Sequence, residues 1–177
     1  ETHDNVFRQT TARLPWLLIG MIGGIGNSMI LGNFDSTFAA HPEMALYIPL
    51  IGGTGGNVGT QSSAIVVQGL ANSSLDAENT LKQVLKESTV ALINATIISM
   101  LVYIYNFVRF GATATVTYSV SISLFAVVMF ASIFGTLVPM TLEKLKIDPA
   151  IATGPFISIT NDIIGMMIYM GITTLLS

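Results

Sequence analysis

Five long stretches of the sequence are almost free of charge, and this feature constrains the fold more than any other. They cover residues 14–34, 44–71, 88–108, 116–142 and 150–177, and a single charged residue lies within them. A helix needs about 20 predominantly apolar residues to cross a bilayer. None of the stretches shows the ten-residue alternation that is typical of barrel strands. The sequence therefore predicts an all-α integral membrane protein with five transmembrane helices.

The composition supports a membrane location and excludes several function classes. Charged side chains make up 10% of the residues, whereas a soluble domain carries about 25%. We therefore expect membrane lipid, rather than water, around most of the chain. The net charge of −3 leaves no basic stripe to neutralise phosphates, which argues against nucleic acid as a partner. The sequence has no cysteine, which excludes thiol catalysis and Cys-based metal sites.

The basic residues predict an orientation, because Lys and Arg in short loops accumulate on the cytoplasmic side. Six of the seven fall in segments that share one side of the membrane: Arg8, Arg13, Lys82, Lys86, Lys144 and Lys146. The other side holds only Arg109. We expect a cytoplasmic N-terminus, an external C-terminus and a multi-pass protein of the plasma (inner) membrane.

Two connections between the stretches carry helix-boundary signals. Between the second and third, a short cytoplasmic amphipathic segment is predicted, with Lys82, Lys86 and Glu87 on its polar side. Before the fifth, Asp148 is typical of an N-cap and Pro149 of a first helical residue. The last helix is therefore predicted to begin sharply at this pair.

Asp162 is the one charged residue well inside a predicted span. An intramembrane carboxylate is costly unless it is paired or hydrated, so it marks a functional site by default. Pro155 is expected to free a backbone carbonyl about two turns before it. The alternative is a protonated Asp162 that packs against a neighbouring helix through a hydrogen bond. Helical spacing places four residues on the same helix face as Asp162: Pro155, Ser158, Gly165 and Tyr169.

The second stretch contains an unusual run from Gly52 to Gln61, in which glycine is interspersed with small polar residues. Gly53, Asn57 and Gln61 recur at every fourth position and so share a helix face. A segment this rich in glycine is a poor helix former and can expose its carbonyl oxygens. Oxygen dipoles along a pathway are what cations need. The alternative is a surface for close helix packing, built from pairs of small residues.

These residues resemble the transmembrane domain of the MgtE family of magnesium channels and transporters. The resemblance runs through nearly the whole chain in order. It rests on the Arg13-Leu-Pro-Trp16-Leu segment, the run from Pro49 to Gln61, Gly69-Leu70, Gly135, Pro139, Asp148-Pro149-Ala150, Pro155, Thr160, Asp162 and Gly165. One departure is Gln68, where many members have a basic residue. The family's cytosolic regulatory part, an N-terminal domain and a CBS pair, is expected to be absent ahead of Glu1.

The resemblance implies a homodimer with a Mg²⁺-selective pore between the two chains, lined mainly by the second and fifth helices. Residues 1–177 would form a single transmembrane pore domain. Asp162 of each chain would bind the ion, assisted by backbone carbonyls near Ser158. The residues predicted to line the pore are Gly52, Gly53, Gly55, Gly56, Asn57, Gly59, Gln61, Pro155 and Gly165.

The chemistry of the ion leads to the same mechanism. Mg²⁺ gives up water reluctantly, so a pore should recognise the hydrated ion. Two Asp162 carboxylates would supply up to two negative charges, and protonation at low pH should weaken occupancy. Mn²⁺ and other divalent cations are expected to pass or block, because oxygen ligands discriminate poorly among similar dications.

Two other functions stay open from the residues alone. One is a divalent cation transporter coupled to Na⁺ or H⁺, although no second buried acid is evident that would carry the coupling ion. The other is a membrane assembly subunit in which Asp162 serves packing. An enzyme is not expected, because paired carboxylates, a Ser-His arrangement and a His motif are missing.

Overall fold

The computed structural model describes residues 5–152 and 154–177, and in this part of the chain the regular elements are all helices, without a strand. The prediction of an all-α protein is confirmed. In chain order the elements are α1 (Val6–Gly32), α2 (Asp35–Ala40), the 3₁₀ helix η1 (Pro42–Tyr47), α3 (Ile48–Ala71), η2 (Ala77–Asn79), α4 (Thr80–Phe110), α5 (Thr115–Lys144), η3 (Pro149–Ala152) and α6 (Pro155–Leu176). Each predicted stretch corresponds to one long helix.

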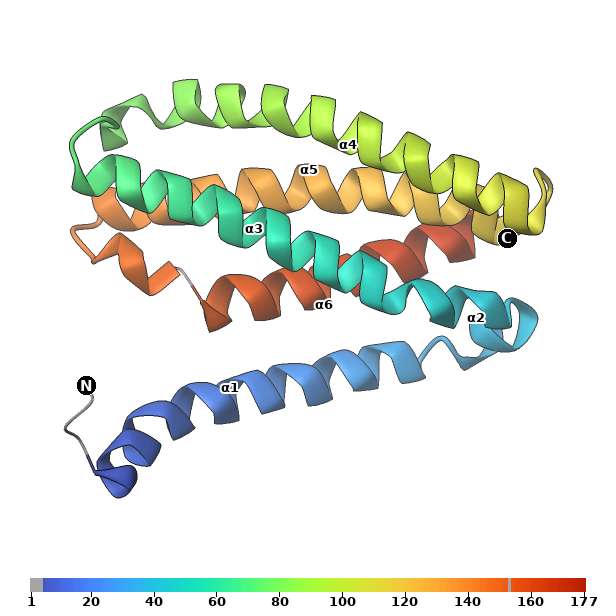
Figure 1. Ribbon diagram of the computed structural model, residues 1–177, viewed down its shortest axis with the longest axis horizontal. Coiled ribbons are helices and arrows are strands. Elements are labelled where there is room, and N and C mark those ends of the chain that lie inside the picture. The colour runs from blue at the N-terminus through green and yellow to red at the C-terminus, as the bar shows by residue number, and fades with distance from the viewer. Residues whose placement is uncertain (1–4, 153) are drawn as a thin grey trace.

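The five long helices run alternately in opposite directions, and the start of α1 and the end of α6 lie at opposite ends of the molecule (Figure 1). Helix α5 runs through the bundle and packs against α3, α4 and α6, whereas α1 packs mainly against α6. In Figure 1, α1 lies apart from the bundle of the other four. None of its residues is buried.

Four segments are long and apolar enough to cross a membrane: Val6–Gly32, Ala77–Phe110, Thr115–Lys144 and Pro155–Leu176. Helix α3 has 24 residues, which at about 1.5 Å per residue also suffices to cross a bilayer. Helix α3 has a lower hydropathy than these four segments, because its middle is rich in glycine and contains Asn57, Thr60 and Gln61. The comparison by length and hydropathy therefore supports four of the five predicted spans.

Small residues let α3 and α5 approach each other closely. A methyl group added at Gly135 would lie 2.7 Å from the backbone oxygen of Gly59 and 3.3 Å from its Cα atom. A side chain at Gly135 would hold the two helices apart. At the end of the bundle near η1, hydrogen bonds also tie the helices together. The Tyr169 hydroxyl donates to the carbonyl of Met44 over 2.8 Å, and the Tyr47 hydroxyl donates to Asn106.

The start of the last helix differs from the prediction. Asp148 and Pro149 begin only the short helix η3, in which the Asp148 carboxylate accepts a hydrogen bond from the amide of Ala150. Helix α6 begins at Pro155, after Gly154, which has a φ of +88°. A residue in this conformation cannot continue a helix, and the position before a proline disfavours helical backbone. Pro155 is therefore a first-turn residue, and the predicted carbonyl opening within a helix is wrong.

Helix α4 also differs, because no separate amphipathic segment precedes it: one helix runs from Thr80 to Phe110. Lys82 and Lys86 are exposed as predicted, but Gln83 and Glu87 are buried against the bundle. Glu87 is therefore a buried acid in addition to the half-buried Asp162, whereas the sequence analysis placed Glu87 on the polar side and expected no second buried acid.

Candidate functional site

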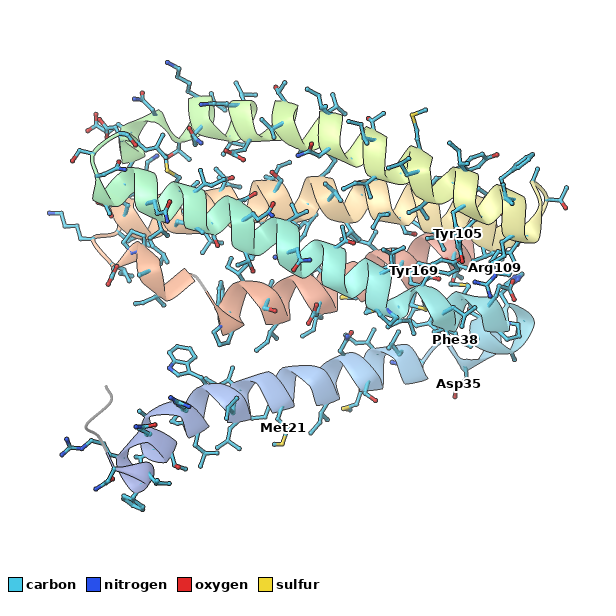
Figure 2. The ribbon with its side chains drawn as sticks, viewed as in Figure 1. Met21, Asp35, Phe38, Tyr105, Arg109 and Tyr169 are labelled. Carbon is cyan, nitrogen blue, oxygen red and sulfur yellow. The ribbon has the colours of Figure 1, made fainter. Side chains whose placement is uncertain are left out.

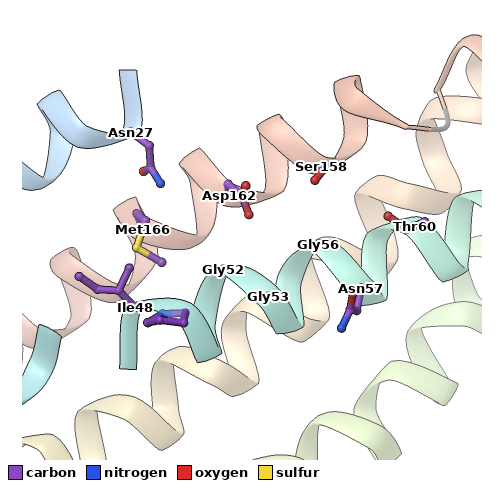
Figure 3. Close-up of a pocket in the computed structure, with 11 residues that line it drawn as sticks. Asn27, Ile48, Gly52, Gly53, Gly56, Asn57, Thr60, Ser158, Asp162 and Met166 are labelled. Atoms are coloured by element: carbon purple, nitrogen blue, oxygen red, sulfur yellow. The ribbon is translucent and has the colours of Figure 1, made fainter. Parts of the chain in front are cut away.

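The candidate site is a cavity of about 430 Å³ in which α3 faces α6. Two sequence-predicted residues of α6, Ser158 and Asp162, share this cavity with the glycine run of α3 (Figure 3). Its lining consists of Asn27, Ile48, Pro49, Gly52, Gly53, Gly56, Asn57, Thr60, Ser158, Asp162 and Met166. The two segments that the sequence analysis singled out as unusual therefore meet in space.

Glycine leaves space where α3 passes the carboxylate of Asp162. A methyl group added at Gly52 would lie 3.5 Å from Oδ1 of Asp162, and one added at Gly56 would lie 3.9 Å from the same atom. The methyl group added at Gly56 would also lie 3.8 Å from the Ser158 hydroxyl oxygen. Side chains at these positions would fill the space between the α3 backbone and the carboxylate. The glycines thus keep a polar cavity open beside Asp162.

The carboxylate of Asp162 is available to a ligand. Its side chain is half-buried, and within the described part of the chain it has neither a hydrogen bond nor an ion pair. The described residues also contain no group of three His, Cys, Asp or Glu side chains that could hold a metal ion. A single chain therefore offers one carboxylate surrounded by neutral oxygen atoms, which suits a hydrated cation better than a fully dehydrated one.

Not every predicted pore-lining residue lies at this cavity. Gly52, Gly53, Gly56 and Asn57 line it, whereas Gly55, Gly59 and Gly165 are buried between helices. Gln61 lines a second cavity between α3 and α4. Pro155 begins α6, about two turns before Asp162, and does not line the cavity.

The sequence analysis missed Asn27, which brings α1 to the site. Its side-chain oxygen is buried without a hydrogen-bond partner in the described structure, and the residue lines the cavity with Asp162 (Figure 3). An amide inside the first apolar stretch was the available signal, since polar side chains within spans usually face protein or a cavity. Thr60 and Met166 also line the cavity and were missed.

Comparisons with known proteins bear on what this cavity binds. Residues 48–172 match the family model MgtE, which is described as a divalent cation transporter. The chain is 33% identical over 162 residues to the magnesium transporter MgtE of Bacillus subtilis (strain 168), covering 92% of this chain and 36% of that protein. It is also 33% identical over 165 residues to the magnesium transporter MgtE of Thermus thermophilus, covering 93% and 36%.

A third relative extends the match to almost the whole chain. The chain is 29% identical over 175 residues to the magnesium transporter MgtE of Enterococcus faecalis (strain V583), covering 99% of this chain and 38% of that protein. The chain therefore spans slightly more than a third of the length of these curated relatives. The matched family residues include all of α3 and Asp162.

Proposed function

Since the chain belongs to the MgtE family of divalent cation transporters, we propose that it forms the transmembrane pore of a Mg²⁺ channel. The observation that carries the proposal is the carboxylate of Asp162, which lies unpaired in a polar cavity walled by the glycines of α3. The proposal covers residues 1–177 as one pore domain. Asp162 binds the ion, and backbone carbonyls near Ser158 assist.

The proposed topology has five spans, a cytoplasmic N-terminus and an external C-terminus. Helix α3 is the remaining span, because it runs the length of the bundle beside α5 and α6 (Figure 1). Its polar residues Asn57 and Thr60 line the cavity beside Asp162. The turns between α3 and α4 and between α5 and α6 lie at the end where α1 begins. Arg109 lies at the other end, where it donates a hydrogen bond to Tyr105 (Figure 2). The positive-inside rule makes this end external.

The proposed channel is a homodimer in the inner membrane, with the pore between two copies of the cavity. The exposed strip of α3 contains Gly53, Asn57 and Gln61, which are poorly suited to lipid contact. A second chain that covers this strip would remove it from lipid and bring a second Asp162 to the same pathway. Two carboxylates would then match the charge of one divalent cation.

The ion that passes is proposed to be hydrated Mg²⁺. Six waters occupy about 180 Å³ at roughly 30 Å³ each, and the open cavity of one chain has a volume of about 430 Å³. Glycine carbonyls, Asn57 and Thr60 can accept or donate hydrogen bonds to these waters. Mn²⁺ and other divalent cations of similar hydration would enter the same site.

A cross-linking experiment tests the dimeric arrangement. Because the sequence has no cysteine, Asn57→Cys creates a unique thiol on the exposed strip of α3. We expect a short bifunctional thiol reagent to convert most of this variant into a covalent dimer. The control is Ile104→Cys on α4, a position that is 57% exposed and is predicted to face lipid. Equal dimer yields for the two variants would contradict a dimer axis along α3.

A flux experiment separates the channel from the coupled transporter. The purified protein is reconstituted into liposomes that contain a Mg²⁺-sensitive dye, with choline as the monovalent cation and equal pH on both sides. A channel should conduct Mg²⁺ down its own gradient and follow an imposed membrane potential. Flux that appears only after a Na⁺ or pH gradient is added would favour the Na⁺- or H⁺-coupled transporter. No flux under either condition would reject both.

A further inference from the structure

A second cavity lies between α3, α4 and α5, on the side of α3 away from the candidate pore. It encloses about 150 Å³, or about five water volumes of roughly 30 Å³ each. Five of its lining side chains carry oxygen atoms and come from all three helices: Gln61, Ser62, Glu87, Asn94 and Ser132. The proposed pore mechanism uses none of these side chains except Gln61.

Glu87 is the only charged residue that lines this cavity. It is 9% exposed, and its Oε1 atom accepts a hydrogen bond of 3.2 Å from the Gln83 amide. Helix α3 has no charged residue, and the charged residues of α5 are confined to its last two positions. Lys82 and Lys86 of α4 are exposed. Within the described chain, the carboxylate has no ion pair to balance its charge.

The neutral groups around Glu87 present oxygen lone pairs to the cavity. The Ser62 hydroxyl donates to the Ser132 hydroxyl over 3.5 Å, and the Ser132 hydroxyl donates to the backbone carbonyl of Glu87 over 3.4 Å. Both hydroxyl protons are thereby used, while lone pairs remain. The side-chain carbonyls of Gln61 and Asn94 add two further acceptors. A positive charge in the cavity would stabilise an ionised carboxylate with these neighbours.

We propose that this cavity binds a small monovalent metal cation, with Glu87 as its charged ligand. The oxygen atoms of Gln61, Ser62, Asn94 and Ser132 are its neutral ligands. One positive charge balances the single carboxylate of Glu87, whereas a dication would leave an excess positive charge beside it. The site is separate from Asp162, because α3 lies between the two cavities. A bound cation links α3 to α4 directly behind the residues that line the candidate pore.

The test measures thermal unfolding of the purified protein in detergent with EDTA, at constant ionic strength. Replacing choline chloride with NaCl or KCl is expected to raise the unfolding midpoint by roughly 5 °C at saturation. Glu87→Gln keeps the shape of the side chain and its hydrogen bond with Gln83 but removes the charge, so the shift should disappear. The control Glu143→Gln removes an exposed carboxylate of α5 and should leave the shift unchanged. No flux is measured, so the result is independent of the proposed pore.

Three results would overturn this proposal. The first is an unfolding midpoint that does not respond to Na⁺ or K⁺, and the second is a response that persists in Glu87→Gln. The third is a Glu87-dependent shift produced by Mg²⁺ without EDTA at lower concentrations than Na⁺ or K⁺, which would identify a divalent site. If Glu87→Gln does not fold, Asn94→Ala replaces it. The half-maximal cation concentration should then rise about tenfold, and an unchanged concentration would count against the site.

Discussion

Replacing Asp162 with asparagine is expected to lower Mg²⁺ flux by at least a hundredfold. Asparagine has nearly the same shape but no charge, so the cavity walled by Gly52 and Gly56 would remain open. Two unit charges 4 Å apart attract each other by about 4 kcal/mol at an effective dielectric constant of 20. Each 1.4 kcal/mol corresponds to a factor of ten in the dissociation constant of the ion. Water that remains in the pathway screens part of this attraction, so a hundredfold loss is a conservative expectation.

The measurement compares Mg²⁺, Ca²⁺ and Mn²⁺ uptake by liposomes that contain the native protein or Asp162→Asn. The matched control is Asp76→Asn, which removes a negative charge from the α3–α4 turn, where the Asp76 carboxylate accepts a hydrogen bond from the amide of Glu78. Asparagine can accept the same bond, so this control should conduct normally. Lower pH should reduce Mg²⁺ flux through the native protein, as Asp162→Asn does, since protonation removes the charge of Asp162. Unchanged Mg²⁺ flux through Asp162→Asn would assign Asp162 to helix packing.

The helices of this protein could be predicted largely from where charge is missing. The long apolar stretches became α1, α4, α5 and α6, because a chain that lies in lipid must satisfy its backbone within helices. The stretch at residues 44–71 became α3 although its hydropathy is lower. Its polar residues are compatible with a span because they face cavities, and only the packing of α3 against α5 and α6 shows where those cavities lie.

The parts that could not be predicted depend on contacts between distant segments. The Asp148-Pro149 signal is the same for a single 3₁₀ turn and for a long helix, and the backbone of Gly154 decides between them. Glu87 directly follows exposed Lys86, and its burial results from packing against α5, where Ser132 contacts its carbonyl. Asn27 joined the candidate site because α1 packs against α6. None of these contacts leaves a periodic signal in the sequence.

Replacing Gly135 with alanine is expected to cause a large loss of stability. The added methyl group would lie 2.7 Å from the backbone oxygen of Gly59 and 3.1 Å from Cβ of Ser62. Backbone atoms cannot rotate away, so α3 and α5 would have to separate. Overpacking of this kind costs up to about 3 kcal/mol, and the better helix propensity of alanine offsets about 1 kcal/mol. The net loss of about 2 kcal/mol corresponds to a decrease of roughly 4–8 °C in the unfolding midpoint.

Thermal unfolding in detergent, followed by size-exclusion chromatography, measures this effect. Gly24→Ala is the matched control, because no heavy atom lies within 4 Å of its added methyl group on α1, and its midpoint should stay constant or rise slightly. Mg²⁺ flux should also fall in Gly135→Ala, since Gly59 lies two residues after Asn57 and any displacement of α3 moves the cavity lining away from Asp162. If Gly135→Ala unfolds at the native midpoint, the close α3–α5 contact does not determine stability, and the position of α3 depends on its packing against α6 instead.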